Sequence, residues 1–455
     1  MQRSPFAAQT RHLLWLALAL ALCYANALGG AYQWDDYKVI VDNPAVQSWD
    51  AWRSGAWQGI RPLLKLSYLL NWLWGAGAPG FHVVNVGLHL ANSWLVYQLA
   101  LLWLQAQSGR AAACVASAEV APSTLALGTA LLFAVHPVHT EAVTYICGRS
   151  SALMALFYLA GLWLYARSHA PAPLARKAWW APLLLLAALA VKETAITLPL
   201  ALCLWERSCG TPWHTLWQRQ WRWWVVALCG VLYVLSSNDF LLHMQRSAAL
   251  NSLNGNVATQ ALGLVYLMRQ WALPLWLNID PALTLRQSLG QALPELLGLA
   301  ATLWLVHWSW HRRPWLGFAL AWALLHLLAV YLLLPRLDVA NERQLYLAAW
   351  PLGLALVIEV ALAVPGLVRA ALFGALLLVL GGLTVQRNQD YASEISLWEA
   401  TAAQSPTKAR VYANLGYAYQ LAGRPDEARR AYQTALALQP DHAKARYNLQ
   451  RLDAL

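Results

Sequence analysis

The chain has 455 residues, of which 59% are hydrophobic and only 12% carry a charge. Together with a mean hydropathy of +0.41, this composition excludes an ordinary soluble globular protein. The formal net charge of +11 is compatible with nucleic-acid binding, but membrane topology explains the basic residues better. We therefore expect no nucleic-acid partner.

Apolar runs near the length needed to cross a bilayer recur along the chain. They predict an all-α, multi-pass membrane bundle over residues 1–386, with roughly eleven spans. The longer runs cover residues 13–28, 83–104, 152–165, 179–191, 223–235, 296–310, 315–334, 345–364 and 367–385. Two shorter runs, 125–135 and 195–205, reach membrane length when their flanks are included. Tryptophans gather at run ends, where their rings suit the headgroup level.

The positions of Lys and Arg predict the orientation of the helices. Basic residues precede the first run and then fall in alternate loops, around Arg110, Arg167, Arg219, Arg312 and Arg369. We expect these loops and the N-terminus to be cytoplasmic, and the acid-bearing segments and C-terminal tail to face the other side. This alternation requires residues 258–277 to form an interfacial or re-entrant segment.

The N-terminus imitates a secretory signal, because a basic start and an apolar stretch lead to Ala25-Asn26-Ala27. We expect an uncleaved first span, since the apolar run is long and the later elements also look like membrane spans. The high Ala, Leu and Trp content is compatible with a bacterial inner membrane.

The chain changes character near residue 385, where charged residues and Gln replace the apolar runs. We expect residues 387–455 to form a soluble module. Residues 409–442 have the spacing of one tetratricopeptide repeat (TPR), and partial repeats flank it. The matching positions are Tyr412, Leu415, Gly416, Tyr419, Ala428, Tyr432, Ala435 and Pro440. Because such units normally need about three copies, we expect this one to lean on the membrane domain.

Polar groups at the predicted span ends are the candidates for chemistry, because the bilayer makes them costly. The first is Trp34-Asp35-Asp36, just beyond the first span. A carboxylate here could act as a general base or as a metal ligand. In extended backbone, adjacent side chains point to opposite sides, so we expect only one to face a site. Two solvated loop acids are the simpler alternative.

The second group is the segment from His136 through His139 to Glu141, with Arg149 one turn inside the next span. These side chains could relay protons, clamp an anion or bind a metal. The spacing is not His-Glu-x-x-His, and the six cysteines include no Cys-x-x-Cys pair. We therefore expect acid–base and anion contacts in preference to a divalent metal, and no other cofactor.

Further groups lie at or near the same predicted face. Arg61 and Lys65 border an amphipathic run, 63–74, where they could hold a lipid phosphate or only snorkel. A polar row on one helix face is more often helix packing than a binding site. It consists of His82, Asn85, His89 and Asn92. The last group comprises Lys192, Glu193, Asn341, Glu342, Arg343 and Tyr346, in which the arginine has the planar fork that suits phosphate.

The order of these motifs carries a family resemblance. The motifs are Trp-Asp-Asp, Arg-Pro-Leu, Phe81-His82 with Asn85 and His89, His-Pro-Val-His-Thr-Glu-Ala-Val with Gly148-Arg149, Lys-Glu, and Glu-Arg-x-x-Tyr. In this order they resemble the transmembrane-and-TPR O-mannosyltransferase family and its bacterial relatives, within the GT-C class of glycosyltransferases. The likeness covers nearly the whole chain. The chain departs from animal members in having little more than one TPR unit, which leaves a large acceptor-docking surface in doubt.

The resemblance implies an inverting transferase that moves a sugar such as mannose from a polyprenyl-phosphate carrier to an acceptor hydroxyl on the extracytoplasmic side. By that likeness Asp35 is the base, with Asp36 as the alternate. Glu141 lines the sugar or acceptor site, and Arg343 stabilises the departing phosphate. The other residues assigned are Arg61 and Arg149 for the donor phosphate, and His82, Asn85, His136, His139, Lys192, Glu193, Glu342 and Tyr346 for substrate.

Two rival interpretations remain open. One is a non-catalytic membrane scaffold or transporter, in which the TPR module recruits a partner and the polar groups line a path or pack helices. The other keeps the GT-C fold but takes a lipid-linked glycan, not a protein, as the acceptor. The partners that we expect are a lipid-linked sugar, a protein bound through the TPR module, and membrane lipids.

Overall fold

The computed structural model describes residues 5–55, 61–169, 179–236, 252–333 and 338–453, and within them every regular element is helical. The predicted all-α class is therefore confirmed. The helices are α1 (Pro5–Tyr24), α2 (Trp49–Gly55), α3 (Pro62–Trp74), α4 (Gly77–Ala106), α5 (Gly109–Ala116), α6 (Pro122–Val135), α7 (Thr140–Val143), α8 (Arg149–Ser168), α9 (Leu183–Leu189), α10 (Leu198–Ser208), α11 (Trp213–Leu235), α13 (Leu253–Ala272), α14 (Leu293–Arg312), α15 (Pro314–Leu333), α16 (Leu345–Ala363), α17 (Gly366–Asp390), α18 (Glu394–Gln404), α19 (Ala409–Leu421), α20 (Pro425–Leu438) and α21 (Ala443–Asp453).

Five helical stretches in the described residues are long and apolar enough to cross a membrane, which marks the chain as an integral membrane protein. A helix satisfies its own backbone hydrogen bonds, so these Ala- and Leu-rich runs can lie in lipid. The stretches are Ala8–Gly29, Ile146–Ser168, Leu289–Arg312, Glu342–Ala363 and Gly366–Asp390. These five stretches do not establish the predicted number of about eleven membrane spans.

The other predicted spans form helices of different lengths. Helix α4 is 30 residues long but less apolar, because the polar row lies along it. The run predicted at 179–191 contains only the seven-residue helix α9 among its described residues. The segment predicted to be interfacial forms α13, which does not have the apolarity of a span.

The bundle is organised around α4, α8 and α16. Helix α4 packs against α6 and α8, and α16 packs against α6 and α15. Large aromatic side chains fill the interior between them, including the fully buried Trp103, Trp322 and Trp350. Helices α14 and α17, by contrast, expose most of their apolar surface, as expected for helices at a lipid boundary.

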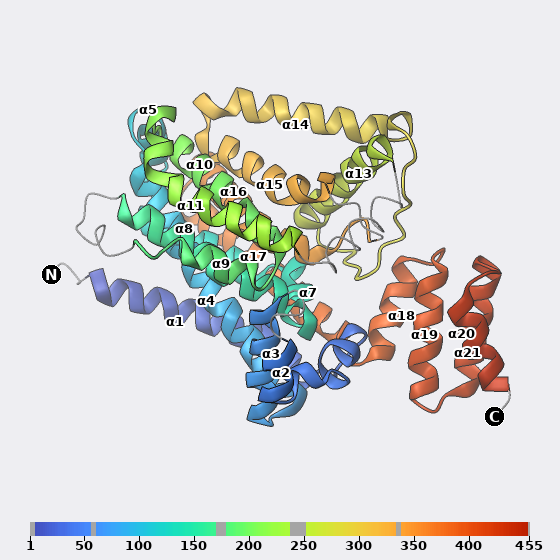
Figure 1. Ribbon diagram of the computed structural model, residues 1–455. Coiled ribbons are helices and arrows are strands. Elements are labelled where there is room, and N and C mark those ends of the chain that lie inside the picture. Colours follow the sequence, from blue (N-terminus) through green and yellow to red (C-terminus); the bar gives the residue numbers. More distant parts are fainter. Residues whose placement is uncertain (1–4, 56–60, 170–178, 237–251, 334–337, 454–455) are drawn as a thin grey trace.

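The C-terminal helices α18 to α21 stand side by side at one end of the molecule, opposite the N-terminus (Figure 1). Helices α19 and α20 form the helix pair predicted from the repeat spacing. A Cβ at Gly416 would lie 2.7 Å from the Tyr432 ring, so the small residue allows the aromatic ring to pack against the partner helix. Gly423 has φ +70° at the turn between the helices, a conformation that favours glycine.

A polar clamp joins this module to the segment after α13. The Asp280 carboxylate, with only 3% of its side chain exposed, accepts a hydrogen bond from Lys408 Nζ at 2.6 Å and from Arg410 Nε at 2.9 Å. Arg410 Nη2 also contacts Asp338 at 2.6 Å. The Ser405 hydroxyl donates to the backbone oxygen of Asp280 at 3.0 Å. The module is thus attached through buried charge as well as through the chain.

We expect Asp280→Ala to loosen the module, because it removes the shared acceptor of two cations. The expected loss of attachment is about 1–3 kcal/mol, since both cations can be partly solvated. Limited proteolysis between α17 and α19 measures it as faster cleavage. Asp338→Ala is the matched control: this carboxylate is 31% exposed and, among the described residues, pairs with Arg410 alone, so its effect should be smaller. Equal protection in all three proteins would contradict the clamp.

Candidate active site

The two adjacent acids after the first span have different environments. Asp36 is fully buried, and its carboxylate accepts hydrogen bonds from the backbone N–H groups of Gln33 at 3.0 Å and Cys147 at 2.9 Å. Burial raises the pKa of Asp36 to about 7. The Gln33 amide in turn donates to the Tyr391 backbone oxygen at 2.5 Å. Asp36 therefore anchors this loop against the start of α8 and the end of α17.

Asp35 is only half-buried, and no described residue donates a hydrogen bond to its carboxylate. Burial raises the pKa of Asp35, and the positive charge of Arg343 opposes this rise. The two acids do not alternate along extended backbone, as predicted, but begin a helical turn. The two acids nevertheless differ in burial, because backbone donors hold Asp36 in the interior whereas Asp35 stays half-buried.

An aromatic column that the motif analysis missed holds the same loop. Trp34 has φ +49°, an uncommon value for a residue with a side chain. Its ring stacks on Tyr145, with centroids 6.3 Å apart, and meets Trp398 of α18 edge-on at 5.5 Å. Tyr145 in turn stacks on Tyr391 at 6.5 Å. The C-terminal module thus contacts the residue directly before Asp35.

Behind this loop lies a cluster of acids and arginines contributed by α7, η9 (Glu342–Gln344) and α17. Glu141 is fully buried and accepts a hydrogen bond from the Arg343 backbone N–H at 3.0 Å, while the guanidinium Nε lies 3.4 Å from its other oxygen. Glu342, also fully buried, lies 3.6 Å from Arg387 Nη2. Arg387 pairs as well with Asp390 at 2.8 Å. Arg387 was not predicted, because it ends an apolar helix and belongs to none of the motifs.

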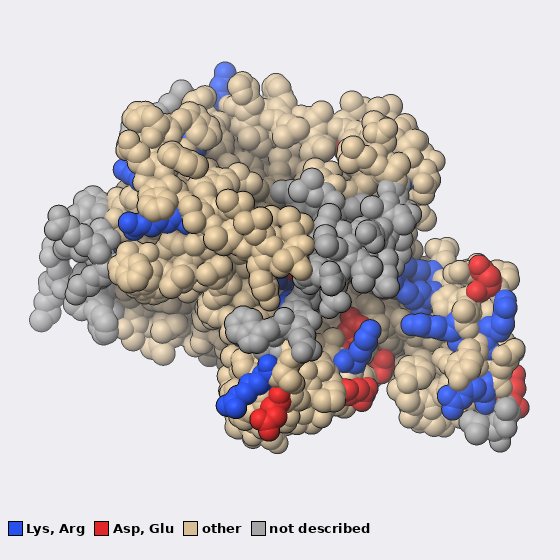
Figure 2. All heavy atoms as spheres, in the orientation of Figure 1, with Lys and Arg blue, Asp and Glu red and all other residues tan. Residues whose placement is uncertain are grey.

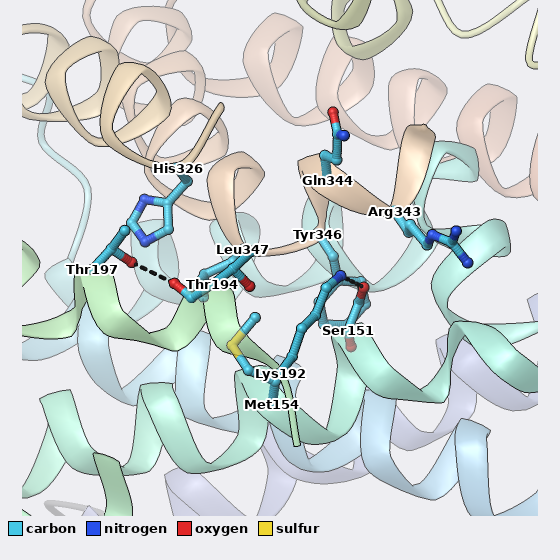
Figure 3. A pocket seen from close by; sticks show the side chains of 10 residues that line it. All are labelled: Ser151, Met154, Lys192, Thr194, Thr197, His326, Arg343, Gln344, Tyr346 and Leu347. Carbon is cyan, nitrogen blue, oxygen red and sulfur yellow. Dashed lines mark hydrogen bonds between the residues drawn. The ribbon is translucent and has the colours of Figure 1, made fainter. Parts of the chain in front are cut away.

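A pocket opens beside Arg343, among α8, α15, α16 and the segment 192–197. The pocket is narrow, with a cavity volume of about 20 Å³, which is room for about one water molecule. The Lys192 amine donates to the Ser151 hydroxyl at 2.9 Å close to Tyr346, and Arg343 stands on one side of this pair (Figure 3). Two cations at a pocket between apolar helices suit an anionic group attached to a lipid. His326, Met154 and Leu347 complete its less polar side.

Two arginines predicted to contact the donor phosphate are engaged by the protein. Arg61 forms a bidentate pair with Glu193, with Nη2–O distances of 2.9 and 3.0 Å. Arg149 is fully buried and donates to the side chains of Asn85 and Asn71, each at 2.6 Å, and to two backbone oxygens. These contacts favour structural roles for both. The assignment of Arg61 and Arg149 to the donor phosphate remains a prediction. The assignment of Glu193 to substrate also remains a prediction, and its carboxylate pairs with Arg61 in the structure.

The polar row on α4 makes buried contacts with neighbouring helices. His82 bonds to the Gly30 backbone oxygen at 3.1 Å, and Asn92 donates to the Ala152 oxygen at 2.8 Å. His89 Nδ1 lies 2.8 Å from the Tyr346 hydroxyl. These contacts match the packing alternative. The substrate-binding assignments of His82 and Asn85 remain predictions.

The predicted histidine pair is buried near the end of α6. His136 Nε2 lies 3.0 Å from the Trp271 backbone oxygen, and burial lowers the pKa of His136 to about 4. His139 is fully buried, burial lowers its pKa, and neither ring nitrogen has a partner in the described part of the chain. Both are therefore neutral near pH 7. No group of three or more potential metal ligands occurs among the described residues.

Comparison with known proteins identifies relatives for this arrangement. The tetratricopeptide repeat family matches residues 409–442, the range predicted from spacing. A Caenorhabditis elegans protein named Protein O-mannosyl-transferase F38B6.6 is 25% identical over 95% of this chain and 63% of its own length. This relative carries the name of a protein O-mannosyl-transferase. The predicted resemblance to protein O-mannosyltransferases is confirmed, and the GT-C class and the bacterial relatives remain predictions.

Two relatives from Drosophila melanogaster match over shorter stretches. Protein O-mannosyl-transferase Tmtc3 is 33% identical over 41% of this chain, and Protein O-mannosyl-transferase Tmtc1 is 37% identical over the same share. These matches cover 23% and 21% of the relatives' lengths, so the chain spans only part of each relative that it matches. No solved structure matches the chain.

Proposed function

We propose that this protein is a GT-C-like membrane glycosyltransferase with about eleven spans. It moves a hexose such as mannose from a polyprenyl-phosphate carrier to a hydroxyl of a protein acceptor. One observation carries the proposal: Asp35 is a half-buried carboxylate near enough to Arg343 to interact with its charge, and Arg343 lines the cationic pocket between membrane helices. The names of the relatives agree with it.

In the proposed reaction Asp35 takes the proton of the acceptor hydroxyl as its oxygen attacks C1 of the sugar. The C1–O bond to phosphate breaks, and the leaving polyprenyl phosphate keeps the electron pair. Attack opposite the leaving group inverts the configuration at C1. Arg343 and Lys192 stabilise the charge that develops on the phosphate. Glu141 acts as a positioning residue, because it holds both the backbone N–H and the guanidinium of Arg343.

We place this chemistry on the extracytoplasmic side of a membrane, with a bacterial inner membrane as the host that the composition suggests. The N-terminus is then cytoplasmic and the TPR module is outside. The alternating Lys and Arg loops support this orientation. On the face shown in Figure 2, charged side chains of both signs lie on the C-terminal helices and on the lower part of the membrane domain, whereas the upper part is largely uncharged.

The purified protein in lipid nanodiscs should release polyprenyl phosphate when given polyprenyl-phosphate mannose and a threonine-containing peptide. The peptide should gain one hexose by mass spectrometry, and boiled protein serves as the blank. If polyprenyl phosphate is released and the hexose is found on a lipid-linked glycan but not on the peptide, the acceptor is the glycan and not a protein. Failure to consume any of a panel of polyprenyl-phosphate hexoses would contradict the proposal and favour a scaffold.

A further inference from the structure

A second pocket lies on the other side of η9, between α13, the segment 276–283 and the end of α18. Its cavity volume is about 380 Å³, near the lower end of the range of ligand sites. Its lining residues are Tyr266, Arg269, Gln270, Trp276, Asn278, Pro281, Ala282, Leu283 and Gln404. None of these residues belongs to the sequence motifs. Gln404 comes from the C-terminal module, so the module forms part of the pocket wall.

Two polar atoms in the pocket wall lack a well-aligned hydrogen bond within the described part of the chain. Gln270 is only 3% exposed, and its amide nitrogen donates to the Trp276 backbone oxygen at 2.7 Å. Its amide oxygen and the buried hydroxyl of Tyr266 form no well-aligned hydrogen bond with the described residues, although these two groups lie close to each other at the wall. Buried polar atoms without partners are costly, so a ligand that supplies them gains affinity. At the wall, the Arg269 guanidinium lies 4.9 Å from the Trp276 ring centre.

The pocket is connected to the proposed site. Asn278 lines it, and the backbone N–H of this residue donates to the buried Glu342 carboxylate. The next residue, Arg343, lines the cationic pocket on the other side. Two consecutive residues of η9 therefore connect the two pockets, because Arg343 lines one and Glu342 is bonded to the wall of the other. The Asn278 side chain also donates to the Ser405 hydroxyl at 2.7 Å, which ties this wall to the module.

We propose that the second pocket binds the acceptor as an extended polypeptide segment that presents a serine or threonine hydroxyl. This inference rests on the proposed function and assigns the cationic pocket to the lipid donor. A polypeptide backbone offers both donors and acceptors to Gln270 and Tyr266. The wall shared with the soluble module suits a substrate that arrives from water. The first pocket, by contrast, lies among membrane helices, where a lipid tail can remain in the bilayer.

The test compares Gln270→Leu with Gln260→Leu. Gln260 lies on the same helix and is equally buried, at 4% exposure, but does not line the pocket. With a fluorescent twelve-residue peptide that contains one threonine, we expect Gln270→Leu to raise the KM for peptide about tenfold or more. The KM for the lipid donor and its slow hydrolysis without peptide should stay unchanged. Gln260→Leu should behave like the native protein.

An unchanged peptide KM in Gln270→Leu would overturn the assignment. A KM that rises only for a lipid-linked glycan would also overturn it, because the glycan would then be the ligand of the second pocket. If the native protein transfers no sugar, a peptide with a photoreactive group still decides the point. If the crosslinks to α13 disappear in Gln270→Leu, the peptide binds in the second pocket even though the proposed function fails. If the crosslinks persist in this variant, the assignment of the pocket to the peptide is wrong.

Discussion

Replacement of Asp35 by asparagine is expected to lower sugar transfer by roughly two to four powers of ten, the usual worth of a general base. Asparagine keeps the volume and one oxygen but cannot take the acceptor proton. Insertion into the membrane and donor binding should survive. Transfer by the native protein should rise with pH as Asp35 ionises. Because burial raises the pKa of this carboxyl, the rise should lie above the range of an exposed aspartate.

Asp36→Asn is the matched control, because it makes the same change one residue along the chain. The Asp36 carboxylate accepts two backbone N–H groups, and an amide oxygen can replace part of that contact. We expect a lower melting temperature with transfer largely retained per folded molecule. If Asp36→Asn loses transfer and Asp35→Asn retains it, the mechanism stands with Asp36 as the base. Near-native transfer by both variants would refute a catalytic role for this loop and favour the scaffold.

Arg343→Ala is expected to lower transfer by about two to three powers of ten and also to weaken donor binding. A cation beside the phosphate acts on the bound donor and on the departing phosphate alike. The contrast with Asp35→Asn is the test: only the arginine variant should raise the KM for the lipid donor. Arg343→Lys should recover part of the activity, since it restores the charge without the fork.

Loss of Arg343 also leaves the Glu141 carboxylate buried beside one cation fewer, so the single variant risks misfolding. The double variant Arg343→Ala with Glu141→Gln removes both charges and should fold better while staying inactive. Native donor affinity in a folded double variant would exclude Arg343 from the phosphate site. Light-scattering gel filtration and donor titration in the same nanodiscs separate folding from binding.

The sequence by itself determined the class of the protein. Apolar composition and run length predict membrane helices because a bilayer leaves a spanning backbone few alternatives to a helix. The repeat at 409–442 was also predictable, since Gly416, Tyr432 and the turn glycine Gly423 have fixed places in a helix pair. The relatives agree with the order of motifs that suggested a transferase.

Only the tertiary structure decided which polar residues share a site, because a side chain's partners come from distant segments. Asp35 and Asp36 look equivalent in sequence. In the structure Asp36 is buried and accepts hydrogen bonds from the backbone N–H groups of Gln33 and Cys147, whereas Asp35 is half-exposed. Arg149 reads as a phosphate ligand until two asparagine side chains are seen to accept its N–H groups. Arg387 belongs to no motif and enters the cluster only because α17 packs beside η9 and α7. Sequence spacing reports the period of a helix, but not which neighbour supplies the opposite charge or the hydrogen-bond acceptor.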